Sequence, residues 1–238
     1  MGRLGSLSPA RLRLMAFATA ETASSCPTTR SCRVDSSRTS FWTSPSMRRE
    51  TGTPVNDVYL MICFDDVRIA HATLHVSVRE AVALITPERV ERVIRVVDTA
   101  LKRLGIAAPK IFVGGLNPHA GEDGMFGSEE NDIIIPAIAR AAQDGIAASG
   151  PFGADTMFRK KDCDAYIVML HDQGHIAAKL QAFNRTAGLS IGSPILFSSV
   201  AHGSAHDIAG KGVADPGAVI EAVTRLARVK AQGRDRAT

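Results

Sequence analysis

From residue 51 onward, short apolar runs alternate along the chain with segments whose apolar residues recur at helical spacing. The apolar runs 58–64 and 67–73 flank the pair Asp65-Asp66, which predicts a hairpin with a tight turn. The next segment begins with Thr86 followed by proline, which predicts the N-cap of a helix. Because strands alternate with helices in this way to the end of the chain, the pattern predicts the α/β class.

The remaining segments continue the alternation. Strands are predicted at 110–114, 146–149, 165–170 and 190–199, and helices at 86–104, 128–144 and 216–226. A chain of 238 residues can bury one good core or two modest ones. It contains no apolar run as long as a membrane span, so we expect no membrane partner.

The net positive charge of the chain comes from its first fifth. Residues 1–50 contain eight arginines, no lysine and three acidic residues, whereas the rest carries a net charge of −1. The sequence pI of 9.0 therefore reflects the first fifth alone. Because the part expected to fold is not basic, we expect no nucleic-acid partner.

Residues 1–46 are rich in Ser, Thr and Arg and show no hydrophobic periodicity. This composition is typical of an organelle transit peptide, of a disordered tail, and of a GC-rich gene translated in the wrong frame. We accordingly divide the chain into an unstructured segment, 1–50, and a folded region, 51–238. The four cysteines form no metal or disulfide framework, which favours a reducing, cytoplasmic compartment.

Three histidines each follow an apolar run and lie in a polar loop motif. His75 lies in T-L-H-V-S-V, His119 in G-G-L-N-P-H-A-G-E and His171 in M-L-H-D-Q-G. A side chain just beyond a buried strand is held rigidly where α/β proteins bind ligands. Three neutral imidazoles that leave coordination positions open are typical of divalent-metal sites. We interpret the three as ligands of one divalent metal rather than as separate loop or core histidines.

The loop that carries His119 is glycine-rich and leads into a helix, as phosphate-binding loops do. However, Glu129 and Glu130 occupy the first turn of that helix and would repel an anion. Metal presentation is therefore favoured over phosphate binding. No G-x-G-x-x-G motif follows a strand, so the cofactor-binding residues stay unassigned.

Three further residues are candidates for the same site. Asp172 and Asp155 supply carboxylates that could hold the second nitrogen of a ligating imidazole. Asp155 could equally be the N-cap of a helix that begins at T-M-F. Lys179 follows His171 by eight residues, which is about two turns of a helix, and could face the same cleft. The alternative for Lys179 is a solvated surface lysine.

The chain contains, in this order, the motifs G-G-L-N-P-H-A-G-E, G-P-F-G-A-D-T-M-F, H-D-Q-G-H and H-G-S-A-H-D-I-A-G-K-G. Together they resemble the 4-hydroxythreonine-4-phosphate dehydrogenase family of pyridoxal phosphate biosynthesis, from about Thr51 to the C-terminal helix. The resemblance implies a fold like that of isocitrate and isopropylmalate dehydrogenases, with helices on both faces of a mixed or parallel sheet. It also implies that His75, His119 and His171 are the metal ligands.

The activity that the resemblance implies is NAD(P)-dependent oxidation of a secondary alcohol, followed by decarboxylation of the β-keto acid. The cofactors would be NAD or NADP and a divalent metal (Zn, Mg or Co). Asp155, Asp172 and Lys179 match catalytic residues of the family, and Lys179 would also bind the substrate, a small-molecule hydroxy acid. The family further implies a homodimer with the active site at the subunit interface.

The sequence departs from the family in several respects. Gly188 and Phe197 occupy positions where the family has an Asn and an Arg that hold the substrate. Phe cannot replace Arg as a bidentate phosphate partner. The family's T-T-H is T-L-H here, and nothing before Thr51 resembles the family's sizeable N-terminal region. We therefore expect residues 1–46 to be out-of-frame or misassigned, and the chain to be an N-terminally truncated, weak or inactive enzyme.

Other functions remain open at this point. One is oxidation of a cis-dihydrodiol carboxylate of aromatic degradation, such as the terephthalate dihydrodiol, because Phe197 suits a ring better than a phosphate. Another is a non-catalytic remnant that binds a metal or a partner subunit. A metal-dependent hydrolase would rest on the three histidines alone and is disfavoured.

Overall fold

The first two strands are the hairpin that the sequence predicts. β1 (Tyr59–Phe64) pairs antiparallel with β2 (Val67–His71), and Asp65 and Asp66 form the turn between them. All six residues of β1 are buried, because the strand has neighbours on both sides and helices pack on the sheet. A strand buried on both faces needs a continuous apolar run, as this one has.

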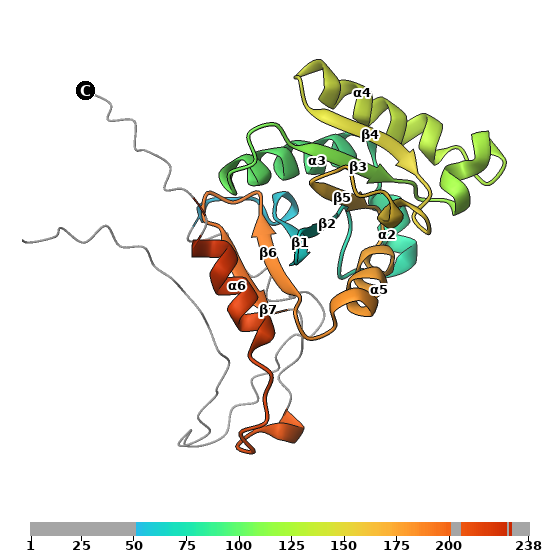
Figure 1. The fold of residues 1–238 in the computed structure, drawn as a ribbon. Coiled ribbons are helices and arrows are strands. Elements are labelled where there is room, and N and C mark those ends of the chain that lie inside the picture. Colours follow the sequence, from blue (N-terminus) through green and yellow to red (C-terminus); the bar gives the residue numbers. More distant parts are fainter. Residues whose placement is uncertain (1–50, 201–205, 228, 230–238) are drawn as a thin grey trace, which may run out of the picture.

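The computed structural model describes residues 51–200, 206–227 and 229, and its described strands form one sheet in the order β4-β3-β5-β2-β1-β6-β7 (Figure 1). The other strands are β3 (Lys110–Gly114), β4 (Ala147–Phe152), β5 (Ala165–Val168), β6 (Ala187–Ile191) and β7 (Phe197–Val200). From β4 to β2 neighbouring strands run parallel, whereas β1 and β7 run antiparallel to their neighbours. The sheet is mixed, as the resemblance implies. The expectation for residues 1–46 lies outside the described residues.

Helices cover both faces of this sheet (Figure 1). The α-helices are α2 (Val78–Leu84), α3 (Pro87–Arg103), α4 (Ile135–Gln143), α5 (His171–Ala182) and α6 (Gly217–Ala227). The short helical turns are η2 (Val55–Asp57), η3 (Pro118–Gly124), η4 (Glu130–Ile134), η5 (Met157–Arg159) and η6 (His206–Ile208). The larger apolar cluster joins one face of the sheet to α3 and α4, and a second cluster joins the other face to α5. Within the described ranges, no helix combines the length and apolar character needed to cross a bilayer.

Helix α3 shows how local sequence signals produce these elements. Its N-cap is Thr86, as predicted, whose hydroxyl oxygen accepts a hydrogen bond from the backbone N–H of Arg89 (3.2 Å). Val90, Ile94 and Leu101 lie on one face of the helix and are fully buried. Burial of each such side chain stabilises the fold by about 1.5–3 kcal/mol.

The prediction of one continuous strand at 190–199 is wrong. The chain turns at Gly192, which has a φ of 94°, and returns as β7 antiparallel to β6. A Cβ on Gly192 would lie 2.0 Å from the carbonyl oxygen of Asp57, so only glycine fits this close approach. Pro194 follows in the same turn and has no N–H to donate to a continuing ladder.

Candidate functional site

The three predicted ligand histidines follow three neighbouring strands. His75 comes after β2, His171 after β5 and His119 after β3. These strands lie side by side in the order β3-β5-β2 and run parallel. Their carboxyl ends therefore meet at one edge of the sheet, which is where open α/β sheets bind ligands.

His171 is oriented by the residue that follows it. Its Nδ1 lies 2.7 Å from a carboxylate oxygen of Asp172. An ionised carboxylate can only accept, so Nδ1 carries a proton, and in the neutral tautomer Nε2 is the nitrogen that faces a cation. The preceding turn is fixed by Gln173, whose amide oxygen accepts hydrogen bonds from the backbone N–H groups of Met169 and Leu170 (3.0 and 2.9 Å).

Hydrogen bonds tie the loops at this edge to one another. The amide nitrogen of Gln173 donates to the carbonyl oxygen of Gly115, which joins the loops after β5 and β3 (3.1 Å). The hydroxyl of Thr73 donates to the carbonyl oxygen of Met169, which joins the loops after β2 and β5 (2.7 Å). The loops that carry the three histidines are therefore held in contact by side chains.

His75 lies beside His171, with ring centroids 5.5 Å apart. Burial, and secondarily the neighbouring His171, lower the pKa of His75. A lower pKa favours the neutral imidazole that a metal requires. Two residues later Ser77 caps α2, since its hydroxyl oxygen accepts a hydrogen bond from the backbone N–H of Glu80 (3.2 Å). This cap ends the loop and leaves His75 at the edge of the sheet.

His119 is the third predicted ligand and lies in the loop after β3. Among the described residues, no three His, Cys, Asp or Glu side chains are grouped closely enough to hold a metal ion. His119 begins a run of five residues with left-handed backbone angles, whose φ values lie between 45° and 81°. For residues other than glycine this conformation costs roughly 1–2 kcal/mol each. For the three predicted ligands to share a metal, their side chains would have to lie closer together than they do here.

The buried carboxylate of Glu130 anchors the loop that leads to His119. It accepts hydrogen bonds from the backbone N–H groups of Leu116 and Asn117 (2.7 and 2.8 Å) and from the side-chain amide of Asn117 (2.9 Å). Burial alone would raise the pKa of Glu130, but the hydrogen bonds from Asn117 and Leu116 hold it below its ordinary value. A carboxylate of the chain therefore already uses the backbone N–H groups that could otherwise bind an anion.

Asp155 lies in the loop after β4, next to the loop of His119. Gly153 lies between the two loops. A Cβ on it would lie 2.7 Å from a carboxylate oxygen of Asp155 and 3.7 Å from the Cα of His119. The alternative role of Asp155 as an N-cap is wrong, since the N-cap of η5 is Thr156. Asp155 is exposed, so its carboxylate is accessible at this edge of the sheet.

Lys179 lies on α5, two turns after His171, so the helix that its predicted placement required is present. Its ammonium group lies 5.3 Å from the centroid of the Phe183 ring, and the side chain is half-buried. The Lys179 side chain is thus packed against the ring of Phe183. The structure thus places Lys179 on the same helix as His171 and Asp172.

Sequence reasoning missed two histidines that lie against this site. His71, on β2, is buried, and its Nε2 lies 3.1 Å from Nδ1 of His175. The His175 ring stacks on the His171 ring, with centroids 3.7 Å and planes 10° apart. The spacing of four residues between His171 and His175 is a helical signal for this contact. His71 gave no such signal, because it lies within an apolar run of the sequence.

The two departures from the family pattern lie on β6 and β7. Gly188 is within β6, opposite Ile62 and Ser199. Phe197 begins β7, opposite Ser190. A phenyl group at this position offers a phosphate no hydrogen-bond donor.

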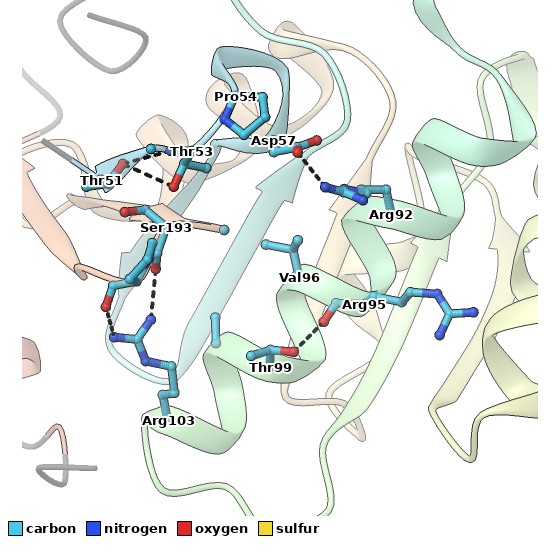
Figure 2. Close-up of a pocket in the computed structure, with 14 residues that line it drawn as sticks. Thr51, Thr53, Pro54, Asp57, Arg92, Arg95, Val96, Thr99, Arg103 and Ser193 are labelled. Carbon is cyan, nitrogen blue, oxygen red and sulfur yellow. Dashed lines mark hydrogen bonds and ion pairs between the residues drawn. The ribbon is translucent and has the colours of Figure 1, made fainter. Parts of the chain in front are cut away.

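A cavity of about 630 Å³ lies away from the predicted site, between α3 and the segments before β1 and after β6 (Figure 2). Arg92, Arg95 and Arg103 line it. The first two form ion pairs with carboxylates, and Arg103 donates to two backbone carbonyl oxygens (3.0 and 2.9 Å). None of the predicted site residues lines this cavity, so it adds nothing to the proposed centre.

Residues 44–226 match the family of the pyridoxal phosphate biosynthetic protein PdxA. A Pseudomonas aeruginosa protein provisionally named 4-hydroxythreonine-4-phosphate dehydrogenase 2 is 47% identical over 175 residues, which are 70% of this chain and 52% of that protein. The 1,2-dihydroxy-3,5-cyclohexadiene-1,4-dicarboxylate dehydrogenase of a Comamonas species is 42% identical over a match that covers 74% of this chain and 56% of that protein. The D-threonate 4-phosphate dehydrogenase of Cupriavidus necator is 41% identical over a match that covers 75% of this chain and 54% of that protein. The chain thus spans about half the length of these curated relatives.

Solved structures agree with the observed fold. The crystal structure of a 4-hydroxythreonine-4-phosphate dehydrogenase from Klebsiella pneumoniae is 34% identical, with a TM-score of 0.69, covering 77% of this chain and 57% of that one. A β-decarboxylating dehydrogenase from Thermococcus kodakarensis is 19% identical, with a TM-score of 0.52, over a match that covers 77% of this chain and 58% of that one. At that identity the second structure supports the fold alone, and it confirms the predicted fold class.

Proposed function

The chain belongs to the family of the pyridoxal phosphate biosynthetic protein PdxA, and from this premise we propose that it is an NAD(P)-dependent, divalent-metal-dependent dehydrogenase of secondary alcohols. The oxidised product is a β-keto acid, which then loses carbon dioxide. The observation that carries the proposal is the convergence of three loops, each bearing one predicted ligand, at the carboxyl ends of β3, β5 and β2.

His75, His119 and His171 would hold the metal. The donor chemistry fits, because the hydrogen bond to Asp172 selects the tautomer of His171 whose Nε2 can bind a metal, and burial favours a neutral His75. A divalent cation at this place would lower the pKa of the substrate hydroxyl and polarise the resulting ketone. His119 has to approach the other two, and the left-handed turn that begins at His119 is the segment that changes.

Lys179 and Asp155 would act on the substrate from either side of this centre. Lys179 offers a cationic group to the carboxylate of a hydroxy acid. Asp155, exposed beside the loop of His119, offers a carboxylate that can receive a proton. NAD or NADP would accept the hydride, since no side chain can do so.

A second substrate class is favoured by one specific observation. Phe197 stands where the family resemblance places an Arg, so the phosphate of a phosphorylated alcohol loses a charge-assisted partner. One relative is named for a cyclohexadiene diol dicarboxylate, and a phenyl side chain suits such a ring. Oxidation of a cis-dihydrodiol carboxylate is therefore the alternative reaction.

The site would be completed in a homodimer. Helix α5 exposes Ile176, Leu180 and Phe183, with exposed fractions of 57%, 83% and 65%, and these residues form an apolar stripe beside Lys179. Burial of such a stripe against a second copy is favourable. Analytical ultracentrifugation of the wild type and of Leu180→Asp tests this, and a wild type that stays monomeric at micromolar concentration contradicts it.

The function itself is tested with the purified chain, a divalent metal and NAD⁺ or NADP⁺. We expect slow reduction of the nicotinamide, followed at 340 nm, with 4-hydroxythreonine 4-phosphate, D-threonate 4-phosphate or the cyclohexadiene diol dicarboxylate. We also expect Asp172→Asn to weaken metal affinity by about 10- to 100-fold, measured by calorimetry. Asp66→Asn, in the hairpin turn, is the matched control. An equal affinity in both variants contradicts the proposed role of Asp172, and no reduction with any alcohol contradicts the proposed activity.

A further inference from the structure

His71 and His175 form a pair with no role in the function proposed above. His71 is only 1% exposed, on β2, and His175 is half-buried on α5, one turn after His171. The pair joins residues 104 positions apart in the chain. The helix lies close above the strand here, because a Cβ on Gly174 would lie 2.4 Å from Nε2 of His71.

The hydrogen bonds of this pair assign a tautomer to each ring. Nδ1 of His71 lies 3.3 Å from the carbonyl oxygen of Leu60, which can only accept, so Nδ1 carries the proton. Burial, and then the neighbouring His175, lower the pKa of His71 to about 3, so the ring is neutral and its Nε2 is bare. Nε2 of His71 faces Nδ1 of His175, and two bare nitrogens cannot bond to each other. Nδ1 of His175 therefore carries a proton, which it also directs toward the carbonyl oxygen of His171 (3.2 Å).

The tautomer of His175 decides what its second nitrogen can do. With the proton on Nδ1, the neutral ring has a bare Nε2 that can accept a hydrogen bond. The two nitrogens lie on opposite sides of the ring, and Nδ1 faces the buried His71. Nε2 is therefore directed away from the core. His171, His175 and Lys179 recur at four-residue spacing and so lie along one face of α5.

We propose that Nε2 of His175 accepts a hydrogen bond from a substrate hydroxyl, and that His71 is a positioning residue that fixes the tautomer required for this contact. The inference rests on the proposed function, since it places His175 between the ligand His171 and the substrate-binding Lys179. The alcohol that undergoes oxidation is assigned to the metal, so the hydroxyl at His175 is a second one, on the neighbouring carbon.

The proposal narrows the substrate class to acids with two adjacent hydroxyl groups. An amine in place of the second hydroxyl would bring an ammonium ion close to Lys179. Since like charges repel, this arrangement is disfavoured. A vicinal diol acid therefore suits the site better than the corresponding amino alcohol.

The tautomers are measured without any substrate, by long-range ¹H–¹⁵N correlation on the full chain labelled with ¹⁵N-histidine. We expect both His71 and His175 to carry the proton on Nδ1. In His71→Leu the His175 signal shifts toward the other tautomer. His71→Gln preserves the Nδ1–H tautomer of His175, because the amide oxygen of Gln accepts a hydrogen bond from that Nδ1–H. His206→Leu, an exposed site, is the control and leaves both signals unchanged. A wild-type His175 with its proton on Nε2 overturns the inference.

Binding is measured by calorimetry of the Zn²⁺-loaded chain with 2,3-dihydroxybutanoate and with threonine, which differ only in a hydroxyl or an amine on carbon 2. We expect 2,3-dihydroxybutanoate to bind more tightly than threonine, and both His175→Leu and His71→Leu to weaken its binding by about twofold to tenfold. His71→Gln should retain the wild-type affinity. Equal affinity for the two ligands overturns the inference while the proposed function stands. If the tautomers are as expected but neither ligand nor any other alcohol binds, the proposed function fails, and the substrate contact fails with it.

Discussion

Single hydrogen bonds decide what each imidazole of this site can do. Asp172 accepts a hydrogen bond from the Nδ1–H of His171, and the carbonyl oxygen of Leu60 accepts one from the Nδ1–H of His71. Each bond leaves the opposite nitrogen bare, so one ring is prepared for a cation and the other for a neighbouring imidazole. Residue identity alone does not give these roles, because either nitrogen of a histidine can carry the proton.

Alanine substitution of the three predicted ligands tests the metal site at this scale. We expect His75→Ala, His119→Ala and His171→Ala each to lower the bound metal below one ion per chain, because each removes one of three protein ligands. Metal content after dialysis, measured by mass spectrometry, checks this, and His206→Ala serves as the control. Wild-type stoichiometry in all three variants contradicts the assignment.

The pKa of His71 predicts a pH dependence of stability. The unfolded imidazole binds a proton below its ordinary pKa of 6.5, whereas the folded one, with a pKa of about 3, does not. The folded state is therefore favoured above pH 6.5 and loses stability as the pH falls from 6.5 toward 3, by about 1.4 kcal/mol per pH unit. Urea unfolding at pH 7.5, 6 and 5 measures this slope. We expect a shallower slope for His71→Leu, and an unchanged slope contradicts the buried, neutral state.

At the scale of elements, the strands deliver the histidines and the loops hold them. β2, β5 and β3 end at one edge of the sheet, and Thr73 and Gln173 join their loops. The loop after β3 differs from the other two, because it enters a left-handed turn and is anchored by Glu130. The His119 loop therefore differs from the other two in its backbone conformation and in its carboxylate anchor.

Glu130→Gln tests the anchor of that loop. The amide can still accept from one side, but its NH₂ group would face the side-chain amide of Asn117 as a second donor. Hydrogen bonds to a charged group contribute about 1.5–3 kcal/mol, so we expect a loss of that size in unfolding free energy. Metal affinity should fall as well. Asp132→Asn, exposed in the same helical segment, is the control, and equal stability of the two variants contradicts the anchoring role.

At the scale of the whole molecule, one mixed sheet with helices on both faces places the proposed centre at its edge and α5 beside it. The two positions that distinguish this chain from the family pattern, Gly188 and Phe197, lie on the strands at the far end of the sheet order. The proposed substrate preference thus depends on β6 and β7, whereas the proposed metal chemistry depends on β2, β5 and β3.

This division predicts that phosphate esters are poor substrates of this chain. Loss of a charge-assisted phosphate contact at position 197 costs about 1.5–3 kcal/mol, or roughly one to two decades in affinity. We expect Phe197→Arg to restore part of that affinity for 4-hydroxythreonine 4-phosphate and to leave the unphosphorylated alcohol unchanged. Steady-state kinetics or calorimetry with both ligands measures the ratio. A clear wild-type preference for the phosphate ester contradicts the prediction.

The sequence by itself determined the elements whose signals are local. The hairpin turn, the Thr86 cap and the periodic face of α3 depend on residues a few positions apart, so they could be read directly. The placement of each ligand histidine after a strand was also predictable, although its role as a ligand stays a prediction. Only the tertiary structure decided the order of the strands, the turn at Gly192 and the contact between His71 and His175. These features depend on packing between residues far apart in the chain, and a histidine in an apolar run gives no sign of the partner that will face it.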